Sequence, residues 1–115
     1  MEGRETNMAV NSQLLKGLMD KVILKIINEE ETYGYEIYIK LQELGFIDFA
    51  EGSLYPLLLR LEKKGLIKGI KRKSQIGPDR KYYSLTEEGI QEMNDFKESW
   101  DKINSAMEKL WNNGY

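Results

Sequence analysis

Basic side chains in the middle of the chain are the residues whose type and spacing suggest chemistry. Residues 60–81 carry a net charge of +7, whereas residues 1–59 carry −5 and residues 82–115 carry −4. A basic block of this kind can neutralise phosphates and release their counterions, and the acidic flanks would keep a polyanion away from other faces. The charge distribution therefore favours nucleic-acid binding, although the 115-residue chain has a net charge of −2.

Catalysis is not expected, because the chain contains no histidine and no cysteine. Without histidine it lacks the commonest general base and the imidazole ligands of metal sites. Without cysteine it has neither thiolate metal ligands nor disulfides. No Asp or Glu lies in an apolar stretch that would fit it for acid–base work. We therefore expect no catalytic residue, no metal site and no cofactor. The chain also has no run of 18 apolar residues and no signal-peptide pattern. The absence of cysteine fits a reducing cytoplasm, which is the expected location.

Apolar periodicity predicts two helices before the basic block. Apolar pairs recur every four residues from Gln13 to Ile27, which is typical of a helix with a wide apolar stripe. Thr32 is the expected N-cap of a second helix, and Gly45 is its expected left-handed C-cap. Residues 1–12 are polar and irregular, and we expect a flexible tail there.

A third helix is expected between Ser53, as its N-cap, and Gly65. Pro56 would then lie in the first turn, where its missing N–H costs little. Its apolar stripe follows helical spacing and consists of Leu54, Leu57, Leu58 and Leu61. This stripe should face the core and leave the other side of the helix exposed.

Two strands, residues 66–73 and 80–85, are predicted on either side of a Gly77-Pro78-Asp79 turn. Thr86 is the expected N-cap of a final helix. Its apolar positions alternate by three and four like a coiled-coil seam: Met93, Phe96, Trp100, Ile103, Met107 and Leu110. A helix of this length is only marginally stable on its own, so its apolar seam needs a partner surface.

The order of these elements predicts a mainly α fold with a small β-hairpin, that is, a winged helix-turn-helix plus a C-terminal dimerisation helix. Residues 13–85 would form the DNA-binding domain and residues 86–115 the dimerisation helix. In a helix-turn-helix the start of the second motif helix contacts base edges. The predicted DNA-binding residues are Ser53, Tyr55, Pro56 and Arg60 on that helix, and Lys71, Arg72, Lys73, Arg80 and Lys81 on the hairpin. The alternative is a solvated helix face and an edge hairpin kept soluble by its charge.

Two further features each leave two interpretations open. Gly34, between Tyr33 and Tyr35, suggests close approach of the backbone to the first helix or to a phosphate, which either tyrosine hydroxyl could also bind. Trp100 lies in the middle of the apolar seam. It either only packs a dimer interface, or it flanks a cavity with its symmetry mate and stacks on a flat aromatic ligand.

The sequence resembles the PadR-like family of winged-helix transcriptional regulators. The resemblance rests on TYGYEI at residues 32–37, GSLYPLLLRLEKKGLI at residues 52–67, GPDRKYYSLTEEG at residues 77–89 and the single C-terminal helix. That short helix is similar to a compact subfamily that includes a multidrug-binding repressor. The resemblance implies a homodimer that represses by binding pseudo-palindromic promoter DNA and is relieved by phenolic or planar aromatic ligands.

The resemblance also implies roles for particular residues. The dimer interface would be built from the first and last helices by Leu15, Met19, Met93, Phe96, Trp100, Ile103, Met107 and Leu110. The ligand would contact Leu18, Phe96, Trp100 and Ile103. The competing function is a winged-helix protein-interaction module without specific DNA binding, which would bind duplex DNA weakly and with little salt dependence.

Overall fold

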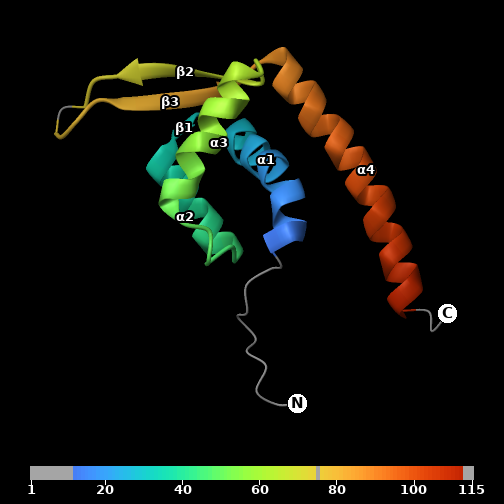
Figure 1. Cartoon of the computed structure of the whole chain (residues 1–115). Coiled ribbons are helices and arrows are strands. Elements are labelled where there is room, and N and C mark those ends of the chain that lie inside the picture. Colours follow the sequence, from blue (N-terminus) through green and yellow to red (C-terminus); the bar gives the residue numbers. More distant parts are fainter. Residues whose placement is uncertain (1–11, 75, 113–115) are drawn as a thin grey trace, which may run out of the picture.

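The computed structural model describes residues 12–74 and 76–112. Its elements are α1 (Ser12–Glu29), β1 (Thr32–Tyr33), α2 (Gly34–Leu44), α3 (Glu51–Lys63), β2 (Ile67–Arg72), β3 (Arg80–Leu85) and α4 (Glu87–Asn112). The predicted class, mainly helical with a β-hairpin, is confirmed (Figure 1). The predicted tail lies outside the described residues, except for Ser12, which begins α1.

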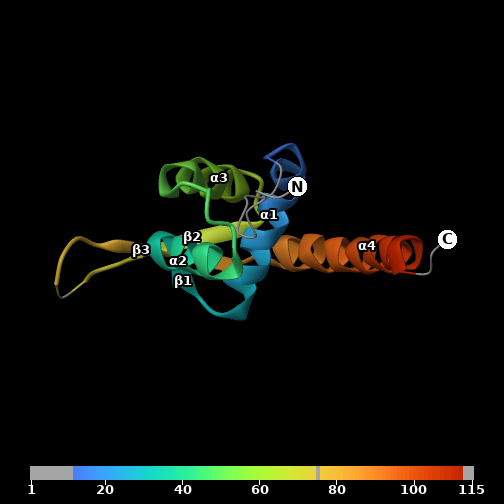
Figure 2. The same cartoon turned by 90° about the horizontal axis from the view of Figure 1, so that it is seen from below.

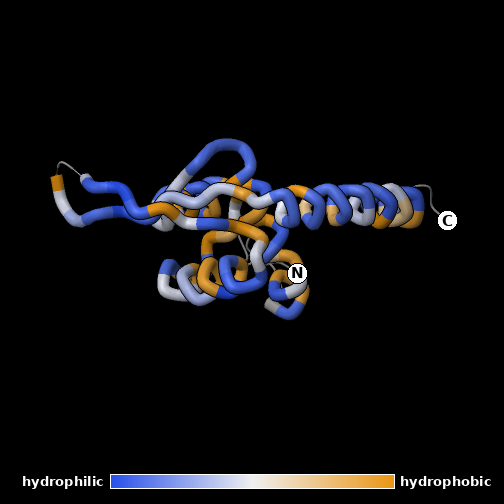
Figure 3. Tube along the Cα trace, turned by 90° about the horizontal axis from the view of Figure 1, so that it is seen from above, coloured by the Kyte–Doolittle hydropathy of each residue, from blue (hydrophilic) through white to orange (hydrophobic). Residues whose placement is uncertain are grey.

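One apolar core lies between α1, α2, α3 and the base of the hairpin. The side chains that are almost fully buried are Ile23, Leu24, Ile37, Leu41, Leu54, Leu58, Leu61 and Ile67. Burial of each of these side chains stabilises the folded state by about 1.5–3 kcal/mol relative to leaving it in water. The predicted stripe of α3 is thus confirmed as its core-facing side. In Figure 3 the apolar colour is concentrated where these helices meet, while most of the outer hairpin is hydrophilic.

Two glycines end α2 and α3, as predicted. Gly45 has a φ of 109°, and its N–H donates to the carbonyl of Gln42 while the N–H of Phe46 reaches the carbonyl of Leu41. Gly65, with a φ of 78°, ends α3 with the same pair of bonds. Glycine adopts these angles without steric cost, so these two positions set the lengths of both helices.

The predicted start of α3 is wrong by three residues. The helix begins at Glu51 with Ala50 at the N-cap position and no side-chain cap bond, so Ser53 is already inside the helix. The Ser53 N–H instead donates to the Ala50 carbonyl. Pro56 consequently lies in the second turn, where it cannot supply the N–H that the Gly52 carbonyl would otherwise accept.

A short third strand was not predicted. Thr32 pairs with Tyr83 and Tyr33 pairs with Tyr82, which gives an antiparallel sheet of order β1-β3-β2. Thr32 is buried in this sheet and its hydroxyl donates to Glu36 at 2.7 Å. The N-cap position of α2 belongs to Tyr33, so the prediction of Thr32 as a cap is wrong.

A tight junction joins α4 to the end of α3. The Thr86 hydroxyl accepts the N–H of Gly89 at 3.0 Å, as predicted for an N-cap, and it donates to the Gly65 carbonyl at 2.6 Å. The Thr86 N–H donates to the Leu66 carbonyl at 3.1 Å. A Cβ added at Gly89 would collide with the same Leu66 carbonyl oxygen. These four residues, the α3–α4 junction, fix where α4 starts.

Beyond the junction α4 runs away from the domain. Lys21 of α1 pairs with Glu92 at 3.2 Å near the start of α4. Farther along, the helix projects outward, and it leaves the body in the direction opposite to the hairpin (Figures 1 and 2). The apolar side chains of its second half are therefore left without cover from their own domain.

Substitution of Gly89 by alanine should destabilise the protein, because the new methyl group meets a backbone carbonyl that cannot move aside. We expect Gly89→Ala to lower the free energy of unfolding by about 1–3 kcal/mol, measured by urea denaturation at fixed protein concentration. Gly17→Ala is the matched control, since nothing lies within 4 Å of its added Cβ. The control should raise stability by about 0.5–1 kcal/mol. Equal effects of the two changes would contradict the close contact at Gly89.

Candidate DNA-binding surface

The outward face of α3 lies opposite its buried leucines. It carries Gly52, Pro56, Leu59 and Lys63, all of which are exposed. Leu59 is 52% exposed, although its residue type alone favours a core position. The sequence prediction missed Leu59 and Lys63 as surface residues of this helix. Their helical spacing from Leu54 would have placed them there.

Tyr55 lies on the flank of α3 that faces the start of α2. A Cβ added at Gly34 would be 2.6 Å from Cε1 of the Tyr55 ring. Gly34 therefore allows close approach of α3, a neighbour that the sequence analysis did not predict for it. The Tyr55 hydroxyl donates to Glu51 at 2.9 Å. Burial first, and then this bond to Glu51, raise the pKa of Tyr55.

The opposite flank of α3 faces α1. Arg60 pairs with Asp20 at 2.6 Å, and Ser53 and Arg60 both line an open cavity of about 580 Å³. Apolar side chains of α1 and of the link between α2 and α3 complete this cavity, including Leu15 and Phe49. The structure thus separates Ser53 and Arg60 from Tyr55, and it gives Arg60 a carboxylate partner within the chain.

The wing, formed by β2, β3 and the loop between them, has two faces of different composition. The strand register pairs Lys71 with Lys81 and Arg72 with Arg80, and side chains alternate along a strand, so these two pairs lie on opposite faces. Lys81 donates to Glu62 of α3 at 2.9 Å, which places the lysine pair on the α3 side. This bond raises the pKa of Lys81 against a smaller opposing effect of desolvation.

The other face of the wing carries stacked tyrosines and arginines. The guanidinium of Arg72 lies 4.8 Å from the Tyr82 ring centre, and that of Arg80 lies 4.6 Å from the Tyr33 ring centre. The Tyr33 and Tyr82 rings meet edge to face at 5.2 Å, and Arg72 also pairs with Glu31 at 2.6 Å. Three predicted DNA-binding residues, Tyr33, Arg72 and Arg80, therefore lie together on the face away from α3.

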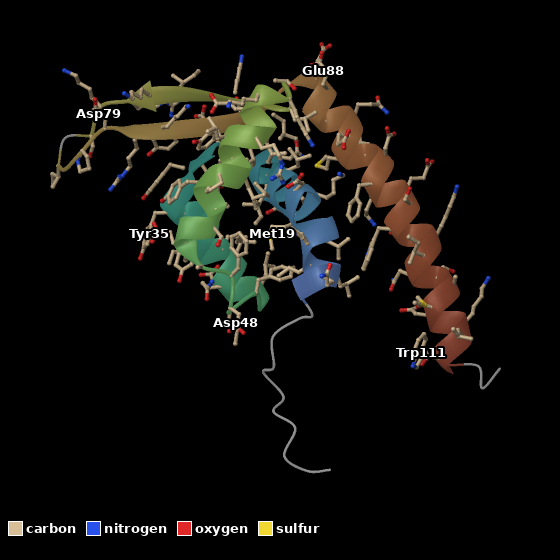
Figure 4. The ribbon with its side chains drawn as sticks, viewed as in Figure 1. Met19, Tyr35, Asp48, Asp79, Glu88 and Trp111 are labelled. Atoms are coloured by element: carbon tan, nitrogen blue, oxygen red, sulfur yellow. The ribbon has the colours of Figure 1, made fainter. Side chains whose placement is uncertain are left out.

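Lys71 and Lys73 remain available for a polyanion. Both are exposed, and neither forms an ion pair with a residue in the described part of the chain. Tyr35 is 51% exposed and projects outward beside α2 and α3 (Figure 4). Together with the outward face of α3 and with Tyr55 and Lys81, these residues form what we call the α3–wing surface. An exposed helix face beside basic side chains is a feature that winged-helix DNA-binding sites share.

Residues 12–74 and 76–112 offer neither a metal centre nor a membrane span. This part of the chain has no group of three or more acidic side chains placed to hold a metal ion. None of its helices combines the length and apolarity needed to cross a bilayer.

A helix-turn-helix followed by a two-stranded wing defines the winged-helix class of proteins. Residues 23–95 match the family model described as the transcriptional regulator PadR-like family. The chain therefore belongs to the PadR-like family, and it is a transcriptional regulator with a winged-helix DNA-binding fold. Family membership confirms the predicted resemblance at the level of the family, and it confirms the prediction that the chain is not an enzyme.

Solved structures of relatives show the same fold. A PadR-like regulator from Bacillus cereus is 45% identical, with a TM-score of 0.80, over 87% of this chain and 97% of its own. A Streptococcus transcriptional regulator is 42% identical, with a TM-score of 0.79, over 89% of this chain and 100% of its own. Bacillus subtilis PadR, solved in complex with operator DNA, is 30% identical with a TM-score of 0.64, over 69% of this chain and 45% of its own.

A curated relative is similar over most of its length. It is an uncharacterised protein of Lysinibacillus sphaericus, 31% identical over 101 residues, which cover 86% of this chain and 93% of the relative.

Removal of Lys71 and Lys73 should weaken binding to duplex DNA and flatten its salt dependence. Loss of two phosphate contacts lowers the slope of log K against log salt by about 1.8 per protomer. The measurement is fluorescence anisotropy of a labelled duplex across a salt series, with Lys71→Ala/Lys73→Ala compared with the wild type. Lys102→Ala/Lys109→Ala on α4 is the control with the same change in charge and should leave the slope unchanged. Weak wild-type binding without salt dependence would instead favour a protein-interaction module.

Proposed function

We propose that the protein is a homodimeric repressor that binds pseudo-palindromic promoter DNA and is released by a small aromatic ligand. The observation that carries the dimer is the open apolar face of α4. The DNA target is supported by the α3–wing surface and by the operator complex of the B. subtilis relative. The site of action would be the cytoplasm, and no cofactor is needed.

The open face of α4 argues for a second copy of the chain. Trp100, Ile103, Met107 and Leu110 are between 40% and 54% exposed, and they follow one another by three and four positions. Contiguous apolar patches of this kind mark interaction surfaces, and the spacing is that of paired helices. Leu15, Met93 and Phe96 would extend the interface. Met19 is only 3% exposed in the single chain, so it has little surface left for a partner.

In the proposed dimer, residues 13–85 bind DNA and residues 86–115 dimerise. Two copies of α3 would enter successive major grooves on one face of the duplex, roughly 34 Å apart. Ser53, Tyr55 and Pro56 would lie nearest the base edges, and Arg60 would be close to the backbone. Lys71, Lys73 and Lys81 would contact phosphates from the α3 side of the wing. Tyr35 would contact the duplex as part of the α3–wing surface. Arg72, Arg80 and Tyr33, on the other face of the wing, would add contacts only if the duplex wraps around the wing.

The ligand would bind between the two α4 helices at Trp100. Phe96 and Trp100 are stacked, with ring centres 6.0 Å apart and an interplanar angle of 25°, which offers a flat apolar wall. Leu18 and Ile103 would complete the site with the symmetry-related Trp100. A ligand that prefers a different angle between the helices shifts the population toward it. The α3–α4 junction would then carry that change to the spacing of the two α3 helices.

A charge placed in the α4 seam should dissociate the dimer. We expect Ile103→Lys to sediment as a monomer at micromolar concentration, because an unpaired ammonium would be buried in an apolar interface. Ser105→Lys, on the opposite side of the same helix, is the matched control and should remain dimeric. Sedimentation equilibrium makes the comparison. A monomeric wild type, or a dimeric Ile103→Lys variant, would contradict the α4 interface.

The ligand site can be tested with a panel of phenolic acids and planar aromatic drugs. We expect saturable quenching of tryptophan fluorescence that persists in Trp111→Phe and is largely lost in Trp100→Phe, because only Trp100 would stack on the ligand. The corresponding dissociation of operator DNA is followed by anisotropy. Quenching that depends equally on both tryptophans would place the ligand elsewhere.

A further inference from the structure

Glu51 is an acidic side chain at the start of the helix that the proposed function places in the major groove. Its carboxylate accepts the Tyr55 hydroxyl proton at 2.9 Å, one turn farther along α3. Tyr55 itself is held by its ring, which lies against Gly34 so closely that no side chain would fit there. The position of the carboxylate is therefore set by packing between α2 and α3 as well as by α3 itself.

The hydrogen-bonding capacity of this pair is unusual for a surface that approaches phosphate. A phenol has a single proton, and Tyr55 donates it to Glu51. An ionised carboxylate only accepts hydrogen bonds. Toward solvent the pair consequently offers lone pairs and no proton. It would repel phosphate oxygens, and it can form a favourable hydrogen bond only with a donor group on the DNA.

In the major groove the donors are the amino groups of cytosine and adenine. Adenine presents the N7 acceptor beside its N6 amino group. A carboxylate that accepts from N6 would therefore place its other oxygen, also an acceptor, against N7. The cytosine ring has no acceptor of its own beside the N4 amino group in the major groove, and carboxylates are suited to this amino group. We infer that Glu51, held by Tyr55, is a specificity-determining residue that recognises the N4 amino group of one cytosine in each half-site. This inference rests on the proposed function.

The test is selection of binding sites from random duplexes by the wild type, Glu51→Gln and the control Glu88→Gln. Glu88 is an exposed glutamate in the first turn of α4, so its variant makes the same change in charge away from the α3–wing surface. We expect the wild type and control to select one common cytosine per half-site. Glu51→Gln should lose that preference by about tenfold and turn toward adenine, which an amide contacts at N6 and N7.

A second variant and a modified base together distinguish a direct contact with cytosine from an effect of the Glu51 charge. Tyr55→Phe keeps the ring against Gly34 and removes only the hydroxyl, so it should weaken discrimination at the same base and leave other positions unchanged. Replacement of that cytosine by 2-pyrimidinone, which lacks the amino group, should weaken wild-type binding but not binding by Glu51→Gln.

The outcomes are distinguishable. If Glu51→Gln binds all duplexes more tightly with an unchanged consensus, Glu51 acts only through its charge and the inference is wrong. The inference is also wrong if 2-pyrimidinone weakens binding by the wild type and by Glu51→Gln equally. If the wild type selects no sequence at all, the proposed sequence-specific function fails, and the inference fails with it.

Discussion

The contact between Gly89 and the Leu66 carbonyl is the constraint on which the arrangement of the protein depends. It brings the first turn of α4 against the end of α3, and the Thr86 hydroxyl bridges the two by hydrogen bonds to Gly65 and Gly89. Any side chain at Gly89 would force these elements apart. Because α3 and α4 share this junction, the packing of α4 against a second copy would determine where the two α3 helices lie.

The distribution of charge over the wing follows from the sheet register. Strand alternation sends Lys71 and Lys81 to the α3 side and Arg72 and Arg80 to the other side. On that far side, each guanidinium lies over a tyrosine ring, and such contacts stabilise the hairpin by about 0.5–1 kcal/mol each. The basic block of the sequence is therefore divided in two: in the proposed function the α3 side would contact DNA, while the arginines on the other side stiffen the wing.

The sequence predicted the helices, the hairpin and the glycine ends of α2 and α3, because long apolar periods and left-handed glycines leave clear signals. It did not predict β1, since two residues are too few for a period to be visible. The residue type of Ser53 predicts an N-cap, although α3 already begins at Glu51. The carboxylate partners Asp20 and Glu31 were missed because they come from elements distant in the sequence, and only the fold brings them to Arg60 and Arg72.

In the proposed dimer, pairing of α4 would set the spacing of the two α3 helices to the groove repeat of DNA. The chain has no cysteine, so Leu59→Cys on the outward face of α3 gives one site per protomer for a spin label. Pulsed dipolar spectroscopy of the labelled protein should give one main distance near the groove repeat of about 34 Å, broadened by the label tether. Absence of dipolar coupling, or a main distance far from that repeat with and without operator DNA, would contradict the account.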